Sequence, residues 1–558
     1  MNGDSRQTGK LTPEKESDPS VFSSEYNKAG IRVGTSITLM VRKRDKKKNG
    51  KISLRNFWGI EKKTELLKSL DITDFDGEYK RCDPREENRF SFWPGEVFTD
   101  YYSWPKVTDL CALPPYHGPS EMRGNSLIAC KSDAPRLSLL EAYLNPNKSD
   151  EEIVALEPRF MKSSGEFNAL TTRATLKGSV VYSKERITPY QFKPFDVRVA
   201  YLDSSVRPLF SRPSPDLLSI SKIPSNGFFI TRDTADKAEE GVPFYFSKFL
   251  CDYDSISGLS RHLPLFVPAY KFSEVKGGAL GHLYEDAPTK ANLSLRARDY
   301  LSELGVTDLD TDPLKASMLW MHCLAVGYSP EYLSENSHGI RHGWPRFLLP
   351  KSEKLLLESA QLGRQVAQLL DTEHPIEPID IGHIRSGFKL IAVVSHEQER
   401  RIDISAGELE VVAGWGYIGN KQATMPGPGK VTQREYKTEE LLEIREIASE
   451  ASISYDEVAK LLGGTTFDVY LNDKVFWRNI PSNLWLYKIG GYQVIKKWLS
   501  YRDKKVLGRS LNLEEVKEVT NISRRLAAII LLQPQLDENY LRIKESAFEW
   551  KNERLLDA

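Results

Sequence analysis

The sequence predicts a multi-domain protein of the α+β class, with an irregular, β-rich region followed by a mixed, helix-rich C-terminal region. A chain of 558 residues is too long for one hydrophobic core, so several domains are expected. Residues from about 80 to 290 are rich in aromatic side chains and proline and contain short β-like runs. From about residue 312 onward, apolar side chains recur at helical spacing.

The N-terminal part combines a polar tail with a short α/β segment. Residues 1–20 are rich in Ser, Lys, Asp, Glu and Pro, a composition typical of disorder. Residues 31–41 alternate as a strand does, and Asn49-Gly50 is a hairpin turn signal before a returning strand at 52–57. Residues 62–70 then have the pattern of a short helix.

Strand signals occur both inside the β-rich region and beyond it. The β-branched and aromatic residues of 178–182 and 195–201 predict two strands. Similar runs at 389–395 and 409–413 predict two more in the C-terminal region. Because these runs are short and widely spaced, we expect small sheets joined by long loops.

The helices of the C-terminal region have identifiable start and stop signals. They are a helix that begins at Asp312-Pro313, a helix over 351–370, a helix over 438–462 stopped by Gly463-Gly464, and a last long helix through Leu532 that Asn512 caps before Pro534.

The most informative stretch is 486–502. Gly490-Gly491 break the chain before a short helical segment, whose residues divide between two faces. Residues 488–509 contain seven Lys or Arg, one Asp and three aromatic residues, a composition typical of a surface that binds nucleic-acid phosphates. One face carries Tyr492, Ile495 and Leu499, which we expect in the core; the other carries Gln493, Lys496, Lys497 and Ser500, of which the lysines suit phosphate contacts.

Bulk composition limits the class of function. With 77 basic and 77 acidic side chains, a nucleic-acid surface must come from segregation of charge rather than from net charge. The longest apolar run, 526–532, is too short to span a bilayer, and the N-terminus has no signal-peptide pattern. Five cysteines without a CxxC pair predict reduced thiols in a cytoplasmic protein.

We assign no catalytic, cofactor-binding or metal-binding residues from the sequence. Residues 414–419 match GxGxxG, but Pro- and Gly-rich sequence follows where a dinucleotide fold needs a helix, so a turn is predicted. Leu113-Pro-Pro-Tyr116 lacks the polar first residue with which amino-DNA methyltransferases bind the target amine. His338 and His342 have metal-ligand spacing, but the glycine after each disfavours a helical metal site. His322 lies in an apolar helix and is expected in the core.

A second group of cationic residues lies in the β-rich region. Lys193 and Arg198 stand beside aromatic residues, and Arg207 and Arg212 each precede a proline. Arginines held by such neighbours suit two-bond contacts to guanine or phosphate. An ion pair between Asp196 and Arg198 that braces the strand end explains the same residues equally well.

A set of short blocks runs along nearly the whole chain: 30–41, 56–59, 63–70, 192–198, 335–336, 344–346, 413–416, 425–427, 468–472, 479–481, Trp485 and 489–499. Together they resemble the C-terminal half of single-chain type ISP restriction–modification enzymes and related adenine-specific DNA methyltransferases of phage-defence systems. The number and order of the blocks make the match specific.

The resemblance implies a division of roles along the chain. Residues 21–75 are expected to be closing strands of a methyltransferase domain, 76–300 a target-recognition region and 301–558 a helix-rich specificity region. The family's S-adenosylmethionine site and Asn-Pro-Pro-Tyr loop precede these regions, and this chain is expected to begin after them. A partner methyltransferase polypeptide then carries both, or the chain is a truncated product that still binds DNA. Lys193 stands where the family pattern has Arg, so a two-bond contact is lost there.

These observations predict the DNA sequence-recognition part of an N6-adenine DNA methyltransferase of a restriction–modification or phage-defence system, which binds double-stranded DNA and not a membrane. Two alternatives stay open: a complete adenine-specific methyltransferase with a cryptic cofactor site, and a structural adaptor subunit. The predicted DNA-binding residues are Lys193, Arg198, Arg207, Arg212, Lys496, Lys497, Arg502, Lys504 and Lys505.

Overall fold

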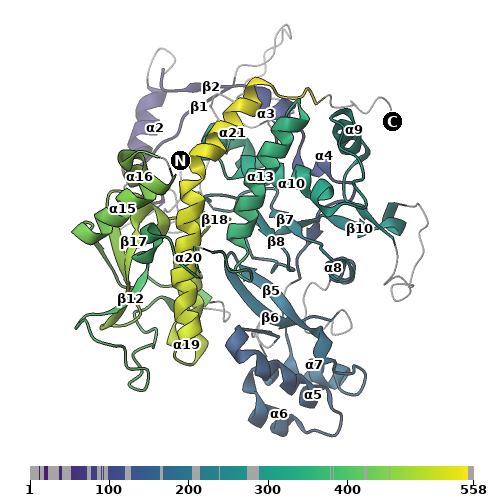
Figure 1. The fold of residues 1–558 in the computed structure, drawn as a ribbon, viewed down its shortest axis with the longest axis vertical. Coiled ribbons are helices and arrows are strands. Elements are labelled where there is room, and N and C mark those ends of the chain that lie inside the picture. The colour runs from purple at the N-terminus through teal and green to yellow at the C-terminus, as the bar shows by residue number, and fades with distance from the viewer. Residues whose placement is uncertain are drawn as a thin grey trace.

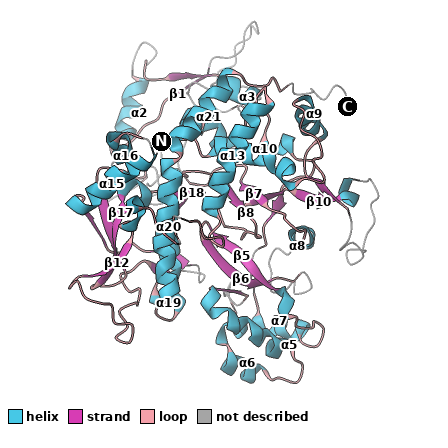
Figure 2. Cartoon of the chain, viewed as in Figure 1, coloured by secondary structure: helices cyan, strands magenta, loops and turns pink. Residues whose placement is uncertain are grey.

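The computed structural model of the chain contains many helices and several small antiparallel sheets, which confirms the predicted α+β class (Figures 1 and 2). The described residues are 12, 18–22, 37–39, 52–71, 77–84, 90, 92, 99–119, 127–163, 167–203, 214–237, 239–272, 288–377, 379–380, 382–419, 424–451 and 453–550.

A short α/β segment precedes the main body. Strand β1 (Ile52–Leu54) pairs antiparallel with β2 (Lys80–Cys82), and helix α2 (Lys62–Leu70) lies between them in sequence. The predicted helix is confirmed, whereas β1 covers only the first three residues of the strand predicted at 52–57. The tail predicted at 1–20 and the strand predicted at 31–41 fall largely outside the described residues.

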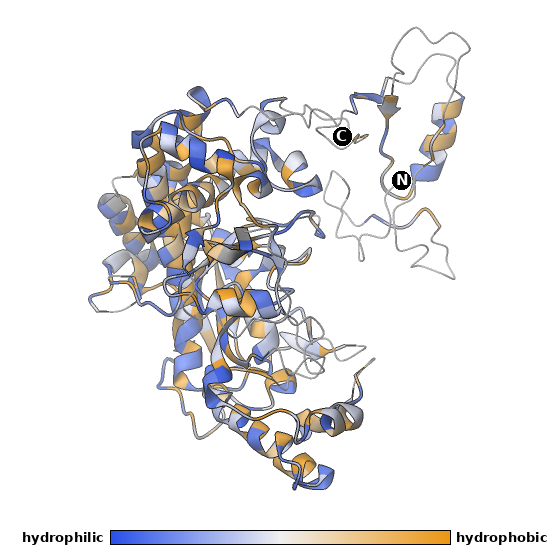
Figure 3. Ribbon diagram, turned by 90° about the vertical axis from the view of Figure 1, so that its right-hand side faces the viewer, coloured by the Kyte–Doolittle hydropathy of each residue, from blue (hydrophilic) through white to orange (hydrophobic). Residues whose placement is uncertain are grey.

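This N-terminal segment presents apolar side chains to solvent. Ile60, Leu67 and Leu70 are 85%, 53% and 67% exposed. In the side view the segment stands away from the main body, with hydrophobic residues along α2 (Figure 3). Clustered apolar exposure of this kind marks a protein interaction surface more often than scattered single residues do.

Small sheets and short helices form the chain up to about residue 300. One sheet has the order β4 (Ile128–Ala129), β6 (Asp196–Tyr201), β5 (Ile187–Lys193), and a second has the order β3 (Tyr116–His117), β9 (Arg261–Pro264), β7 (Phe228–Thr231), β8 (Tyr245–Ser247). Strand β10 (Phe266–Pro268) pairs with β11 (Thr289–Ala291). The helices are α3 (Thr99–Ser103), α4 (Val107–Leu110), α5 (Leu140–Leu144), α6 (Asp150–Leu156), α7 (Ala169–Leu176), α8 (Pro215–Ser221) and α9 (Leu295–Glu303), with a 3-10 helix at Lys131–Leu139.

One of the two strands predicted in this region is wrong. The strand predicted at 195–201 is confirmed as β6. Residues 178–182 instead form the turn that follows α7, because Gly178 has a left-handed φ of +76° and the Val180 amide donates to the Leu176 carbonyl at 3.1 Å. The β-branched residues there were thus a weaker signal than the glycine before them.

Two packed helices form the centre of the C-terminal region. Helix α10 (Pro313–Gly327) is capped by Asp312, and α13 (Glu353–Leu370) is capped by Ser352, so both predicted helices are confirmed. A Cβ on Gly363 would lie 1.8 Å from the Met321 carbonyl oxygen, so glycine allows the helices to approach closely. His322 lies in the core as predicted, with its ring nitrogens 2.8 Å from Ser359 Oγ and the Leu348 carbonyl.

Two consecutive helices end the described chain. Asn512 caps α20 (Leu513–Leu531) as predicted. A further helix, α21 (Gln533–Glu545), follows. It was not predicted, because proline usually ends a helix; Pro534 instead occupies the first turn of α21, where the backbone needs no amide donor. Shorter helices in this region are α11 (Pro330–Glu335), α12 (Ser337–His342), α14 (Ser386–Lys389) and α17 (Ser482–Trp485).

A four-stranded antiparallel sheet lies beside these helices, with the order β12 (Val393–His396), β17 (Val475–Pro481), β16 (Thr466–Tyr470), β15 (Val431–Arg434). The helix predicted at 438–462 is divided into α15 (Thr438–Ala451) and α16 (Tyr455–Leu462), because Ser454 caps a new helix. The strand predicted at 389–395 is confirmed in part as β12, which begins at Val393. The strand predicted at 409–413 is wrong, although the Val412 and Ala413 amides both donate to the Leu471 carbonyl.

The thiols of all five cysteines are buried and form no disulfide. In the described part of the chain, no helix is long and apolar enough to cross a bilayer.

Candidate nucleic-acid interface

The Gly490-Gly491 pair forms the turn of a short hairpin. Strand β18 (Lys488–Ile489) pairs antiparallel with β19 (Tyr492–Gln493), and the two glycines between them have φ values of +54° and +80°. Helix α18 (Val494–Arg502) follows directly. The predicted break before a short helix is therefore confirmed, although the helix begins two residues after Tyr492.

This hairpin turn is inserted between loops of the β-rich region. The Gly490 amide donates to the Val242 carbonyl at 2.7 Å, and the Gly491 amide donates to the Glu240 carbonyl at 2.7 Å. A Cβ on Gly490 would lie 2.3 Å from Ile256, so any larger residue would clash. Glycine is needed here for both the backbone conformation and the close approach.

Helix α18 has the buried face that its sequence predicts, but Ser500 of the predicted polar face is also buried. Ile495 and Leu499 are buried, and Tyr492 is half-buried beside them. Lys496 and Lys497 are both half-buried, and burial lowers the pKa of Lys496. The lysine face is therefore a partly enclosed surface rather than a fully solvated one.

Asp196 of β6 binds two arginines at once. Arg502 Nη1 and Nη2 donate to Asp196 Oδ2 and Oδ1 at 2.7 and 2.8 Å, and Arg198 Nη2 donates to Oδ2 at 2.9 Å. Burial opposes ionisation of Asp196, but the charges of Arg198 and Arg502 outweigh it and hold the pKa of this carboxyl below its usual range. All three side chains thus remain charged in a buried cluster.

This arrangement gives two of the predicted DNA contacts a carboxylate partner inside the protein. Arg502 is 2% exposed and Arg198 is 7% exposed. Their guanidinium groups lie over the rings of Trp498 and Phe192, at 4.2 and 4.0 Å from the ring centroids, and are aimed at Asp196. The position of neither arginine supports a direct phosphate contact, and the alternative of an Asp196–Arg198 ion pair is the one observed.

Lys193 is also enclosed. Its ammonium group lies 3.4 Å from Asp252 Oδ1, donates to the Asp254 carbonyl, and lies 4.7 Å from the Phe192 ring centroid. Burial disfavours the charge, but Asp252, together with Tyr501, Tyr492 and Asp254, outweighs this and raises the pKa of Lys193. Because the group is 4% exposed and already satisfied, a direct DNA contact by Lys193 is not supported either.

Lys497 differs from these three residues. Its Nζ lies between two aromatic rings, 4.8 Å from the Tyr492 centroid and 4.9 Å from the Tyr501 centroid. In the part of the chain that the structure describes, it forms no ion pair with a carboxylate. Burial lowers the pKa of Lys497 to about 7, and the charges of Lys193 and Lys237 add to this effect.

The other predicted contacts lie on or near helix α19 (Lys504–Leu507) or outside the described residues. Lys504 and Lys505 are exposed, and Lys504 forms an ion pair with Glu410 at 2.7 Å. Lys505 forms no ion pair among the described residues. Arg207 and Arg212 belong to a segment that the structure does not describe.

The structure thus unites two groups of cations that the sequence separates by about 300 residues. Strands β5 and β6 supply Lys193 and Arg198, and α18 supplies Lys497 and Arg502. Asp196 was not predicted from the sequence as the partner of Arg502. Contacts of the Tyr492 and Tyr501 rings with a cation were not predicted either, although the repeated pairing of cationic and aromatic residues was a visible signal.

The other motifs do not form sites. Of the turn predicted at 414–419, only a bend at Gly414 is present, because Gly416–Ile418 form strand β13, which pairs with β14 (Thr424–Pro426). The Trp415 and Gly416 amides donate to Asp503 Oδ2, so they are occupied by a side chain of the protein itself. Among the described residues, no group of three or more His, Cys, Asp or Glu side chains could hold a metal ion.

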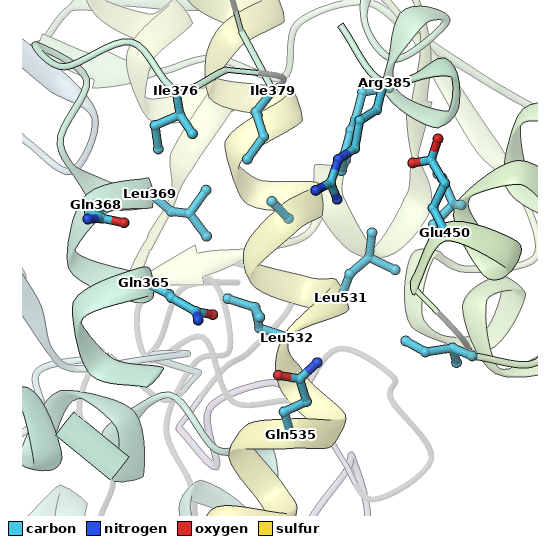
Figure 4. A pocket seen from close by; sticks show the side chains of 14 residues that line it. Gln365, Gln368, Leu369, Ile376, Ile379, Arg385, Glu450, Leu531, Leu532 and Gln535 are labelled. Atoms are coloured by element: carbon cyan, nitrogen blue, oxygen red, sulfur yellow. The ribbon is translucent and has the colours of Figure 1, made fainter. Parts of the chain in front are cut away.

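A cavity of about 290 Å³ lies elsewhere, between α13, α14, α15 and α20 (Figure 4). Its walls are mostly apolar, with residues such as Leu369, Ile379 and Leu531, while Arg385 and Glu450 lie at its rim. One arginine balanced by one glutamate does not provide the positive surface that a polyanion requires. The α18 junction, and not this cavity, is the candidate nucleic-acid interface.

Comparisons with known proteins identify a family and similar folds. The family described as the Type ISP C-terminal specificity domain matches residues 144–529. Among solved structures, the chain is similar to the ATP-dependent Type ISP restriction-modification enzyme LlaBIII bound to DNA, with 13% identity, a TM-score of 0.53, and coverage of 97% of this chain and 30% of that one.

Two further structures are similar. A nuclease-deletion mutant of the Type ISP restriction-modification enzyme LlaGI, in complex with a DNA substrate mimic, has 14% identity and a TM-score of 0.51 over 97% of this chain and 43% of that one. The DrdV–DNA complex has 15% identity and a TM-score of 0.54 over 96% and 47%. The chain therefore spans less than half the length of each. No curated protein matches by sequence.

Proposed function

This chain belongs to the Type ISP C-terminal specificity domain family, and on that basis we propose that it binds double-stranded DNA and reads a target sequence for a restriction–modification system. The observation that carries the proposal is the junction of α18 with β5 and β6. There, cations from two distant parts of the chain meet around aromatic rings, and Lys497 forms no ion pair with a carboxylate among the described residues. DNA phosphates supply the missing negative charge.

The surface that we assign to DNA is narrower than the one predicted from the sequence. Lys496, Lys497, Lys504 and Lys505 are exposed or half-buried and stand on α18 and α19. Lys193, Arg198 and Arg502 act indirectly. The ion pair of Arg502 with Asp196 holds α18 against the β-rich region, and Lys193 and Arg198 lie over the Tyr492 and Tyr501 rings of the same junction. In this proposal the first group binds phosphates and the second group fixes its position.

We further propose that the reaction served by this recognition is N6-adenine methylation. The blocks that resemble adenine-specific methyltransferases support this. S-adenosylmethionine and the catalytic loop then reside on a methyltransferase polypeptide that is distinct from the described residues. The exposed apolar side chains Ile60, Leu67 and Leu70 offer a surface on which such a partner docks. We place this reaction in the cytoplasm, as part of a phage defence.

The direct test is a filter-binding titration of the purified chain with a duplex oligonucleotide at several salt concentrations. We expect measurable binding, with log K falling linearly as log salt concentration rises. Binding that is undetectable at low salt, or that does not change with salt, would contradict the proposal and favour a structural adaptor.

A second measurement separates the recognition subunit from a complete enzyme. The chain is dialysed to equilibrium against labelled S-adenosylmethionine, with and without duplex DNA. We expect the label to stay evenly distributed. Tight binding by the chain alone would show that it carries its own cofactor site.

A further inference from the structure

The Lys497 ammonium group stands in a surrounding of excess positive charge. The positive charges of Lys193 on β5, Arg198 on β6 and Lys237 in the loop between β7 and β8 all act on it. The acidic residue that acts on it is Asp254, and its effect is smaller than those of Lys193 and Lys237. Its own element and the adjoining β19 contribute the Tyr501 and Tyr492 rings.

The nearby carboxylates are already committed to other groups. Asp252 accepts from the Tyr190 hydroxyl at 3.0 Å and from the Asp254 amide at 3.0 Å, and it lies beside Lys193. Asp196 is held by its two arginines. Neither carboxylate can neutralise Lys497 without leaving a buried cation unpaired, which is strongly unfavourable.

The groups around Lys497 are held in place before any ligand arrives. Tyr492 belongs to the hairpin whose turn the Val242 and Glu240 carbonyls fix. Tyr501 packs edge-on against Phe192, with ring centroids 4.9 Å apart. Burial raises the pKa of Tyr492 to about 12 and raises that of Tyr501, so both hydroxyls keep the proton that a phosphate oxygen accepts.

We propose that Lys497, with the Tyr492 and Tyr501 hydroxyls, forms a site for one backbone phosphate of DNA, and that filling this site takes up one proton at Lys497. The proposal rests on the proposed function, because DNA is the source of the phosphate. A phosphodiester carries one negative charge, which is the charge that the cluster lacks. Because the Tyr492 and Tyr501 rings flank the site, the Lys497 ammonium group is the cation that faces the phosphate.

Proton uptake follows from the state of Lys497 before DNA binds. Because its pKa is lowered to about 7, roughly half of the molecules carry a neutral amine at neutral pH. A bound phosphate stabilises the ammonium form and raises the pKa of Lys497. The affinity for DNA therefore falls as pH rises above 7, by up to about tenfold per pH unit for one proton, and is nearly constant below pH 6, where the lysine is already charged.

The experiment measures fluorescence anisotropy of a fluorescein-labelled duplex with the full chain at several pH values between 6 and 9 and at several salt concentrations. Lys497→Arg keeps a cation whose charge does not change over this range, so we expect binding without the loss above pH 7. Lys497→Gln removes the phosphate contact, so we expect weaker binding and a salt slope reduced by about 0.9. Lys354→Gln, at a side chain that is 83% exposed on α13, is the matched control and should behave as the unaltered chain.

The outcomes separate the two proposals. If the unaltered chain does not bind duplex DNA at any pH, the proposed function fails and this inference fails with it. If it binds, but Lys497→Gln keeps the same salt slope or Lys497→Arg keeps the same pH profile, only the phosphate site at Lys497 is overturned. Circular dichroism melting curves of each variant confirm that it is folded, so that a lost affinity is not a lost fold.

Discussion

Arg502 of α18 binds Asp196 of β6 through two hydrogen bonds, although the residues are 306 positions apart in the sequence. The Asp196 side chain is 1% exposed, so water cannot replace either partner. This contact joins the β-rich region to the C-terminal region directly behind the candidate DNA surface. The stability of the whole junction should therefore depend on it.

Arg502→Met tests this dependence. Removal of one partner of a buried ion pair leaves an uncompensated charge, and because Arg198 still binds Asp196 we expect the lower end of such effects, about 3 kcal/mol of unfolding free energy. Urea denaturation followed by tryptophan fluorescence measures the change. Arg542→Met is a matched control, since Arg542 forms an exposed pair with Glu358 and its loss should cost less than about 1 kcal/mol. Equal losses for the two variants would show that the Asp196 pair does not hold the junction.

Asp196→Asn should change how stability depends on pH. In the folded protein the pKa of Asp196 lies below its unfolded value of about 3.9, so the charged carboxylate contributes stability above pH 4 that is lost as pH falls toward the folded pKa. The variant lacks this contribution at every pH. The difference in unfolding free energy between the two proteins should thus be largest near pH 7 and shrink below pH 4. A difference that stays constant down to pH 3 would contradict the assignment.

Gly490→Ala should open the hairpin contact. The added methyl group would lie 2.3 Å from Ile256 on a backbone with positive φ, and overpacking with backbone strain should together cost about 3 kcal/mol. Gly464→Ala is the control, because a Cβ there meets nothing within 4 Å. We expect only the first variant to lower both the thermal midpoint and the affinity for duplex DNA. If the Gly490→Ala variant is fully folded and its affinity for duplex DNA is unchanged, the hairpin does not position the DNA surface.

Lys504 and Lys505 should contribute unequally to DNA affinity. Lys505 has no carboxylate partner among the described residues, so Lys505→Gln should reduce the salt slope of binding by about 0.9. Lys504 already pairs with Glu410, and Lys504→Gln should have a smaller effect. The slopes come from filter-binding titrations between low and physiological salt. A larger effect at Lys504 would mean that DNA displaces Glu410 from that pair.

Local patterns predicted the helices well. The helix at 62–70 and the capped helices after Asp312, Ser352 and Asn512 match the structure, because spacing and capping act within a few residues. The errors also have local causes. The strand predicted at 178–182 is absent because Gly178 has a left-handed conformation that begins a turn. The helix predicted at 438–462 is divided because Ser454 caps a second helix.

The partners of the charged side chains could not be predicted in the same way. Lys193, Arg198 and Arg502 were correctly grouped with aromatic residues, yet their exposure depends on Asp252 and Asp196, which tertiary structure brings to them. A sequence shows that a residue is cationic but not whether its charge is already neutralised. Lys497 is the reverse case, since its lack of an ion pair became visible only when the neighbours were placed.

The hairpin at Gly490-Gly491 holds the β-rich region mainly through main-chain carbonyls and amides, at Glu240, Val242 and Ser257. Main-chain groups are the same in every residue type, so the side chains of those loops can vary without loss of the joint. A β-rich region grafted from a related protein would need to keep Gly241, whose Cβ would otherwise lie 2.2 Å from the Lys488 carbonyl oxygen, together with Asp196 as the partner of Arg502. Such a joint lets the sequence of the β-rich loops change while the C-terminal scaffold stays constant.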